Sequence, residues 1–377
     1  MYLCARNKNF DMNISESNVN QAVELLKVLI NTPSLSREEG DATDRLQHFI
    51  ERGAPVQCEV HRHLNNLWCV APGYDASRPT LLLDAHIDTV KPVSGWSKHP
   101  FTPIIEGDRI YGLGSNDDGA SLVTLLQVFY QICQSKQSYN TIFVASAEEE
   151  VSGKNGIESL IPHLPPISCG IIGEPTSMHP AVAEKGLMVL DCVAKGVSGH
   201  AARNEGVNAL YNAIKDIEWF RNYKYPKSSE LFGDVKMTVT QINAGTQHNV
   251  IPDSCSYVVD IRSNECYSNK ELLEIIKSNV GSSVTARSTR LNSSCISLEH
   301  PLVKRAIELG RKPYGSPTLS NQALLDFPTL KMGPGDTARS HTANEFVLIS
   351  EIREGMKLFA FRPSIRYCNR ERANSEM

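Results

Sequence analysis

The stretch Leu81–Val90 holds the residues whose types and spacing most directly suggest chemistry. A short apolar run, Leu81 to Leu83, is typical of a buried strand, and His86 and Asp88 follow it. Side chains two residues apart in a strand lie on the same side of it. His86 could therefore bind a metal ion while the Asp88 carboxylate orients its ring, as is frequent around metal sites. A surface histidine near an aspartate gives the same short pattern, so further residues must decide.

Further acidic residues stand directly after predicted strands or glycine-rich turns. The stretch Tyr111–Ala120 places Asp117 in a tight turn ahead of a helix, and the apolar run Thr141–Ala147 leads into Glu148–Glu150. Acids in a row often only begin a solvated helix, but ligand sites in α/β proteins form at the carboxyl ends of strands. Neighbouring residues at a strand end point to opposite sides, so two adjacent glutamates are expected to differ in role. The complete set of candidates is His86, Asp88, Asp117, Glu149, Glu150, Glu174 and His341.

Two histidines with several carboxylates and no thiolate suit zinc, cobalt or manganese. A single catalytic zinc ion needs only three protein ligands. Five candidate ligands with additional acids therefore indicate two metal ions that share a bridging carboxylate. A nucleotide-binding loop at Gly112 is excluded, because Asp117 occupies the third glycine position of Gly-x-Gly-x-x-Gly.

The elements that must position these residues alternate between helix and strand. Amphipathic helices are predicted at residues 19–30, 41–52 and 122–133, with short strands near 56–60 and 67–70 and a loop at 91–109. Strands that alternate with helices indicate an α/β fold with a mixed, mostly parallel sheet and helices on both faces.

A second domain is expected inside the first. From about residue 184 the pattern changes to half-exposed strands and two helices in the order β-α-β-β-α-β, with a last strand at 284–291. This order is typical of a ferredoxin-like α+β insert. The 377 residues suit two domains. We therefore expect a discontinuous metal-binding domain, residues 14–183 and 293–365, and an inserted domain at 184–292.

The composition excludes several classes of protein. A net charge of -4 gives no basic surface for nucleic acid or an anionic membrane. No apolar run approaches the ~20 residues of a membrane span, and the first residues lack the apolar core of a signal peptide. The ten cysteines are scattered without a Cys-x-x-Cys motif. These features favour a cytoplasmic protein with reduced thiols.

Five motifs in this order resemble the co-catalytic zinc deacylase and exopeptidase family of acetylornithine deacetylase and succinyl-diaminopimelate desuccinylase. The resemblance covers the chain from about Val19 to Phe359, except that Leu113 and Gly119 replace arginine and lysine of many relatives. The motifs are His86-x-Asp-Thr-Val, Tyr111-Gly-x-Gly-x-x-Asp, Glu148-Glu-Glu-Val, Gly173-Glu-Pro-Thr and Ser340-His-Thr.

The resemblance implies roles for the candidate residues. His86 and Glu174 would bind one zinc ion, Glu150 and His341 the other, and Asp117 would bridge them. The remaining two candidates would act without binding metal, as the general base, Glu149, and the acid behind the first histidine, Asp88. A cis peptide bond is also expected after the bridging aspartate.

For the insert, the resemblance implies a lid and dimerisation domain, and hence a homodimer. His200, in Ser198-Gly-His-Ala, would help to bind the oxyanion, in relatives from the opposite subunit. Asn249 and Arg262 would contact the substrate, with the arginine binding its carboxylate as a fork.

Two late motifs indicate the branch of the family. The stretches Gly315–Asn321 and Gly333–Glu345 look most like acetylornithine deacetylase. The expected reaction is hydrolysis of N2-acetylornithine to ornithine and acetate in arginine biosynthesis. N-acetylcitrulline, N-succinylornithine, succinyl-diaminopimelate and dipeptides stay open as alternative substrates. An inactive relative that only binds is disfavoured, because neither the base nor any ligand is missing.

Overall fold

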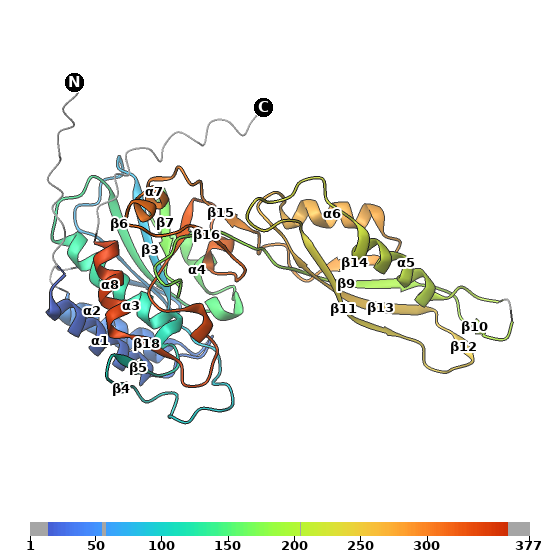
Figure 1. Ribbon diagram of the computed structural model, residues 1–377, viewed down its shortest axis with the longest axis horizontal. Coiled ribbons are helices and arrows are strands. Elements are labelled where there is room, and N and C mark those ends of the chain that lie inside the picture. The colour runs from blue at the N-terminus through green and yellow to red at the C-terminus, as the bar shows by residue number, and fades with distance from the viewer. Residues whose placement is uncertain (1–13, 55–57, 204, 361–377) are drawn as a thin grey trace, which may run out of the picture. The chain divides into compact units, whose positions relative to one another are not determined.

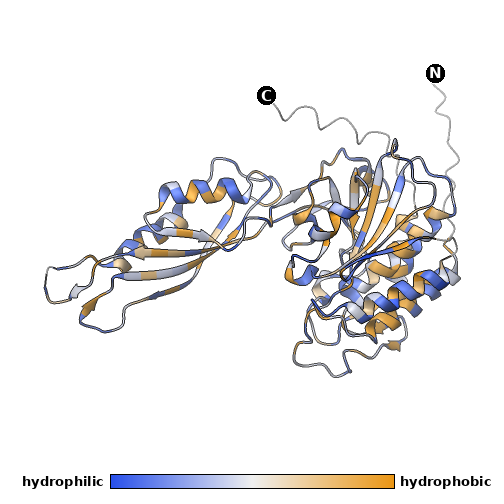
Figure 2. Cartoon of the chain, turned by 180° about the vertical axis from the view of Figure 1, so that it is seen from behind, coloured by the Kyte–Doolittle hydropathy of each residue, from blue (hydrophilic) through white to orange (hydrophobic). Residues whose placement is uncertain are grey.

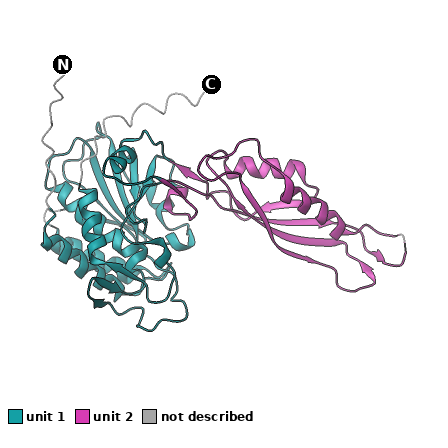
Figure 3. Ribbon diagram, viewed as in Figure 1, with its two compact units in different colours: residues 1–181, 296–313, 325–377 teal, residues 182–295, 314–324 magenta. Residues whose placement is uncertain are grey.

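The computed structural model describes residues 14–54, 58–203 and 205–360 (Figure 1). The chain divides into two compact units (Figure 3). Unit 1 comprises residues 1–181, 296–313 and 325–377, and unit 2 comprises 182–295 and 314–324. The stretch 314–324, which we expected in the metal-binding domain, thus belongs to unit 2. Within unit 2 the backbone N–H and the hydroxyl of Ser320 donate to the buried Glu184 carboxylate. Residues 361–365, assigned from sequence to the metal-binding domain, lie outside the described residues.

The sheet of unit 1 confirms the predicted mixed, mostly parallel α/β fold. Its four central strands are parallel and their residues are almost continuously buried, as expected for strands covered on both faces. Figure 2 shows apolar residues, in orange, concentrated on these strands. The strand order is β1 (Val60–His63), β2 (Asn66–Val70), β6 (Asn140–Ser146), β3 (Thr80–His86), β7 (Cys169–Ile172) and β17 (Thr329–Lys331).

Helix α3 (Ala120–Cys133) packs on β3 and β6 and is itself buried along most of its length. Helices α1 (Glu16–Ile30) and α8 (Ile349–Phe359) pack on α3, and α2 (Gly40–Gly53) packs on β1 and β2. The helices predicted at 19–30, 41–52 and 122–133 are therefore confirmed. The shorter helices are α4 (Ile157–Leu160), α7 (Pro301–Glu308) and the 3-10 turns η3 (Ile161–His163) and η5 (Thr337–Arg339).

Two predictions about unit 1 need correction. The loop expected at 91–109 ends in β4 (Ile104–Glu106), which pairs with β5 (Arg109–Tyr111). Strand β5 in turn pairs with β18 (Phe346–Leu348), so the stabilising partner lies more than two hundred residues away and leaves no local signal. The strand expected at 56–60 begins only at Val60, and residues 55–57 lie outside the described part of the chain.

Unit 2 confirms the ferredoxin-like order. Its antiparallel sheet runs β11-β13-β9-β14, and α5 packs on three of these strands. A separate core forms between sheet and helices, around Leu190, Tyr257 and Ile276. The elements in order are β9 (Met188–Lys195), α5 (Ala209–Asn222), β11 (Lys236–Ala244), β13 (Ser254–Arg262), α6 (Asn269–Asn279) and β14 (Ser283–Ala286).

Smaller elements complete unit 2. Strand β14 is shorter than the predicted 284–291, because its pairing with β9 ends at Ala286. Strands β10 (Gly199–His200) and β12 (Val250–Ile251) pair as a two-stranded antiparallel ribbon. The end of β8 (Ala181–Glu184) pairs with β15 (Ser294–Cys295) and with β16 (Tyr314–Ser316), and η4 (Asn321–Leu324) follows. None of the helices in the described part of the chain is both long and apolar enough to cross a membrane.

Candidate metal centre

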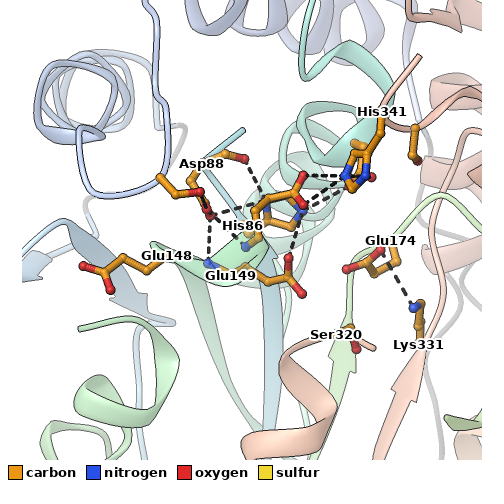
Figure 4. Close-up of polar contacts among 12 residues, drawn as sticks. His86, Asp88, Glu148, Glu149, Glu174, Ser320, Lys331 and His341 are labelled. Atoms are coloured by element: carbon orange, nitrogen blue, oxygen red, sulfur yellow. Dashed lines mark hydrogen bonds and ion pairs between the residues drawn. The ribbon is translucent and has the colours of Figure 1, made fainter. Parts of the chain in front are cut away.

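The candidate ligands of unit 1 gather at the carboxyl ends of its parallel strands (Figure 4). His86 is the last residue of β3, and Glu149 and Glu150 follow β6, whose Ser146 pairs with His86. Glu174 follows β7, and the chain after β17 leads to His341. Parallel strands end at the same edge of a sheet, so residues that are up to 255 positions apart in the chain converge there.

Asp117 lies between the two histidines. Its Oδ1 is 3.1 Å from Nε2 of His86, and its Oδ2 is 3.7 Å from Nε2 of His341. The peptide bond between Asp117 and Asp118 is cis, which confirms that prediction. One carboxylate with an oxygen facing each histidine has the arrangement that a bridging ligand requires.

Two sets of donor atoms are close enough to hold a metal ion, each with its atoms within 4.8 Å of one another. One set combines His86, Asp117 and Glu150, and the other combines His86, Glu149 and Glu174. Nε2 of His341 adds a contact of 3.0 Å with the Glu150 carboxylate. Imidazole nitrogens and carboxylate oxygens without thiolate form the donor set of zinc-class hydrolase sites. The cluster therefore fits two divalent metal ions.

The carboxyl groups of this cluster lie close together and are little exposed. Burial raises the pKa values of Glu149 and Glu174 well above their ordinary range. Lys331, 3% exposed, is the cation nearest to Glu174 in this part of the structure, with its Nζ 3.9 Å from the carboxylate. Buried carboxylates that hold protons for want of positive charge are the groups that a divalent cation would deprotonate and stabilise.

Asp88 has a wider role than the one predicted. Nδ1 of His86 lies 2.8 Å from the backbone carbonyl oxygen of Asp88 and 3.5 Å from its carboxylate. The carboxylate instead accepts the backbone N–H groups of Glu149, at 3.0 Å, and Glu150, at 3.2 Å, and the hydroxyl of Ser36. Asp88 thus positions the backbone of both glutamates as well as the histidine ring.

The expectation that Glu149 and Glu150 point to opposite sides is wrong. The strand ends before them, because Glu148 has a left-handed backbone with φ 54°, and the next residues form the 3-10 turn η2 (Glu149–Val151). Both side chains then face His86 as members of the two donor sets. Glu148 is turned away from the cluster, as Figure 4 shows, and hydrogen-bonds to Asn155.

Sequence reasoning missed Glu345. This buried side chain accepts the backbone N–H groups of Gly114, at 3.0 Å, Asn116, at 2.8 Å, and Asp117, at 3.0 Å. Burial raises its pKa to about 8. Glu345 follows His341 by four positions, so one loop both carries a candidate ligand and fixes the turn η1 (Ser115–Gly119) that carries Asp117. Its place next to a late motif was the available signal.

The three other candidates lie in unit 2. His200 and Asn249 are exposed neighbours at the β10–β12 ribbon, where the Ala201 backbone N–H donates to the Asn249 carbonyl. Arg262 ends β13, and its Nε and Nη2 donate to the Asp260 carboxylate at 2.9 and 3.2 Å. The fork that we expected to bind a substrate carboxylate is thus already engaged by Asp260.

Metal binding is expected to release protons. The hydrogen bond to Glu150 raises the pKa of His341 from 6.5 to about 9, so the metal-free ring is protonated at neutral pH. A metal ligand must be neutral imidazole, so binding expels this proton and the apparent affinity rises as pH increases toward 9. Calorimetric zinc titrations at pH 7 in buffers of different ionisation enthalpy should therefore give different observed enthalpies. Identical enthalpies would contradict the protonated state of His341.

A family model and several curated relatives match this chain. The family model described as Peptidase family M20/M25/M40 matches residues 82–361, well over half of the chain. The acetylornithine deacetylase of Edwardsiella ictaluri is 27% identical over 361 residues, which cover 86% of this chain and 92% of the relative. The succinyl-diaminopimelate desuccinylase of Erythrobacter litoralis is 24% identical over 292 residues, covering 70% of this chain and 75% of the relative.

Solved structures share the fold. A tripeptidase from Staphylococcus aureus superposes with a TM-score of 0.70 at 22% identity, covering 91% of this chain and 98% of that structure. A dinuclear metal binding peptidase from Bacillus subtilis superposes with a TM-score of 0.68 at 16% identity, covering 92% of this chain and 97% of that structure.

Proposed function

The chain belongs to peptidase family M20/M25/M40, and from this premise we propose that it hydrolyses N2-acetylornithine to ornithine and acetate, in arginine biosynthesis in the cytoplasm. The family makes it a metal-dependent amidohydrolase. The choice of substrate rests on how far the relatives match. Those named acetylornithine deacetylase match over 92–96% of their length, whereas the desuccinylases match over about three quarters.

We assign the ligands as the family motifs imply. His86 and Glu174 would hold one ion, Glu150 and His341 would hold the other, and Asp117 would bridge them. The bridging role is supported by the two Asp117 oxygens, each of which faces one histidine. Bound divalent ions, zinc in this proposal, would supply the Lewis acidity that lowers the pKa of a water molecule and polarises the amide carbonyl.

Glu149 is proposed as the general base. Its Oε2 is 3.8 Å from Nε2 of His86, and its backbone N–H is held by Asp88. From there it would take a proton from the attacking water and deliver it to the leaving amine.

The substrate-binding part of the proposal assigns Asn249 and Arg262 to the amino-acid portion and His200 to the oxyanion. His200 and Asn249 lie next to each other at the β10–β12 ribbon, so both would contact the same substrate molecule. Since Asp260 occupies two donors of Arg262, a substrate carboxylate would use the remaining N–H groups of the guanidinium.

A substrate panel tests this function. Purified zinc-loaded protein should hydrolyse N2-acetylornithine with a higher kcat/KM than N-acetylcitrulline, N-succinylornithine, succinyl-diaminopimelate or dipeptides. Release of free amine is measured for each compound at equal enzyme concentration. Preference for another compound would support amide hydrolysis but would contradict N2-acetylornithine as the substrate. No hydrolysis of any compound by protein with full metal content would contradict the proposed function.

We further propose a homodimer formed through unit 2. Strand β11 is an edge strand of its sheet, and it exposes Ile242 at 51%. Helix α5 exposes Tyr211 at 65% and Ile214 at 41%. An unpaired strand edge with exposed apolar side chains is a surface that a second copy can cover across a two-fold axis.

The dimer proposal predicts complementation between two inactive variants, His200→Ala and Glu149→Gln. If His200 acts in the partner's site, a mixed dimer contains one complete site of two. Random subunit exchange of an equal mixture should then restore about a quarter of wild-type turnover. Subunit exchange is verified with differently tagged chains, and activity is measured before and after mixing. Exchange without recovered activity would mean that His200 does not act across the dimer.

A further inference from the structure

Two cysteines far apart in the chain meet at the surface of unit 1. Sγ of Cys58 is 3.9 Å from Sγ of Cys133, and the two residues are 75 positions apart. Cys133 is the last residue of α3, and Cys58 lies in the connection between α2 and β1, outside any helix or strand. Both residues are only partly buried.

The surroundings of this pair differ from those of a buried structural thiol. Cys69 of β2 is fully buried, and burial raises its pKa to about 12. The hydrogen bond with Cys133 instead lowers the pKa of Cys58 and raises that of Cys133. Cys58 is therefore the thiol of the pair that ionises first, and a thiolate is the form that reacts with oxidants.

A buried hydroxyl group adds a second observation. Tyr130 of α3 is 1% exposed, and its hydroxyl has no hydrogen-bond partner among the described residues. Burial raises its pKa, and the charges of the neighbouring thiols Cys69, Cys58 and Cys133 raise it further. An O–H group without a partner can donate to a thiolate that forms next to it.

Small molecules have space to reach Cys133. A cavity of about 260 Å³ is lined by Cys133 together with Ile132, Arg78, Lys136 and Asn140. The cavity is open to solvent and has basic side chains on its wall. Peroxide is a small polar molecule, so this cavity gives it access to Cys133, while Cys58 is itself partly exposed at the surface.

We propose that Cys58 and Cys133 form a reversible disulfide bond when the protein meets hydrogen peroxide. The Cys58 thiolate attacks one peroxide oxygen, the O–O bond breaks, and a sulfenic acid and water result after protonation. The Cys133 sulfur then attacks the Cys58 sulfur, the S–O bond breaks, and a second water leaves with the Cys133 proton. Two thiols are oxidised and one peroxide is reduced to two waters.

The geometry allows this step with a local movement. The two sulfur atoms must close from 3.9 Å to the disulfide length of about 2.0 Å. Cys58 can supply the movement, because no helix or strand holds it. The bond would tie the end of α3 to the segment that precedes β1. Helix α3 begins at Ala120, directly after the turn with Asp117, so the bond restrains the helix that supports the metal centre.

Peptide mapping tests the proposal on the full-length protein. The reduced chain has ten alkylatable thiols, and brief treatment with equimolar hydrogen peroxide should leave eight. Digestion should yield one cross-linked pair of peptides, which contains Cys58 and Cys133 and separates on reduction. Peptides in which both residues remain alkylated, in which Cys58 is linked to another cysteine, or in which Cys58 carries only sulfinic acid would overturn it.

Serine variants provide matched controls. Cys58→Ser and Cys133→Ser should each abolish the cross-link, whereas Cys266→Ser, which removes another partly buried thiol, should leave it intact. The oxidised wild-type protein should melt at a higher temperature than the reduced protein, and this difference should vanish in Cys58→Ser. An unchanged melting temperature in protein that contains the mapped bond would contradict the inference that the bond restrains α3.

Discussion

Removal of the divalent metal ions is expected to abolish hydrolysis entirely. The donor sets around His86 contain buried acids whose pKa values are raised by burial, and divalent ions would stabilise their charged forms. Without the ions, no group in the cluster activates water or polarises an amide at neutral pH. Dialysis against a chelator should therefore lower turnover to background, and zinc or cobalt should restore it.

Metal analysis makes this result quantitative. The active protein should contain about two zinc-class ions per chain, since Asp117 presents one carboxylate oxygen to each of the two histidines. The metal-free protein should also melt at a lower temperature, because ions that bind only the folded state stabilise it. Magnesium, which prefers oxygen ligands alone, is the control and should restore little activity. Full turnover by protein with no measurable metal would refute the two-metal centre.

The replacement of one carboxylate oxygen by an amide nitrogen in Glu149→Gln is expected to have the second largest effect on turnover. Loss of the general base should lower kcat on the order of 10²–10⁴-fold. Metal content should stay near that of the wild type, because the proposed ligands are other residues. Glu150→Gln should instead lose metal, since its carboxylate lies 3.0 Å from His341 and belongs to the set with Asp117. Metal content and kcat are measured on the same preparations.

Glu148→Gln is the matched control. Its side chain is buried but bonded to Asn155, away from the cluster, and glutamine keeps an oxygen that can accept that bond. This variant should retain metal and most of its turnover. The comparison of Glu149→Gln with Glu150→Gln is a strict test, because Glu149 also belongs to a donor set, the one with His86 and Glu174. If Glu149→Gln loses metal while Glu150→Gln keeps it, the two roles are exchanged.

The clustering of the candidate residues could be predicted because strand ends are marked in the sequence. An apolar run that stops at a histidine or an acid marks the edge of a parallel sheet, as at His86, Glu149 and Glu174. The same regularity located the parallel strands β3, β6 and β7. The family motifs added Asp117 and His341, which lie in turns with no periodic pattern.

Contacts that depend on distant partners could not be predicted. The loop at Glu345 bonds to backbone groups more than two hundred positions earlier, and β4 lies in the sheet that the equally late β18 completes. Neither segment has a pattern that reveals its partner. The bent backbone at Glu148 likewise depends on burial and on Asn155, so strand alternation gave the wrong directions for the next two side chains. The sequence shows that Asp260 and Arg262 are two positions apart, but it does not show that their side chains are hydrogen-bonded.

The bonds from Glu345 to the turn around Asp117 also dictate an order of assembly during synthesis. A ribosome that has reached residue 295 has made all of unit 2's first segment, yet unit 1 still lacks β17, α8 and His341. The growing chain therefore contains His86 and Asp117 long before it contains Glu345, whose carboxylate fixes the turn around Asp117. The main core of unit 2 can therefore form while the sheet of unit 1 still lacks β17. In the proposed assignment, the ion held by Glu150 and His341 can therefore bind only after the loop with His341 and Glu345 has been made.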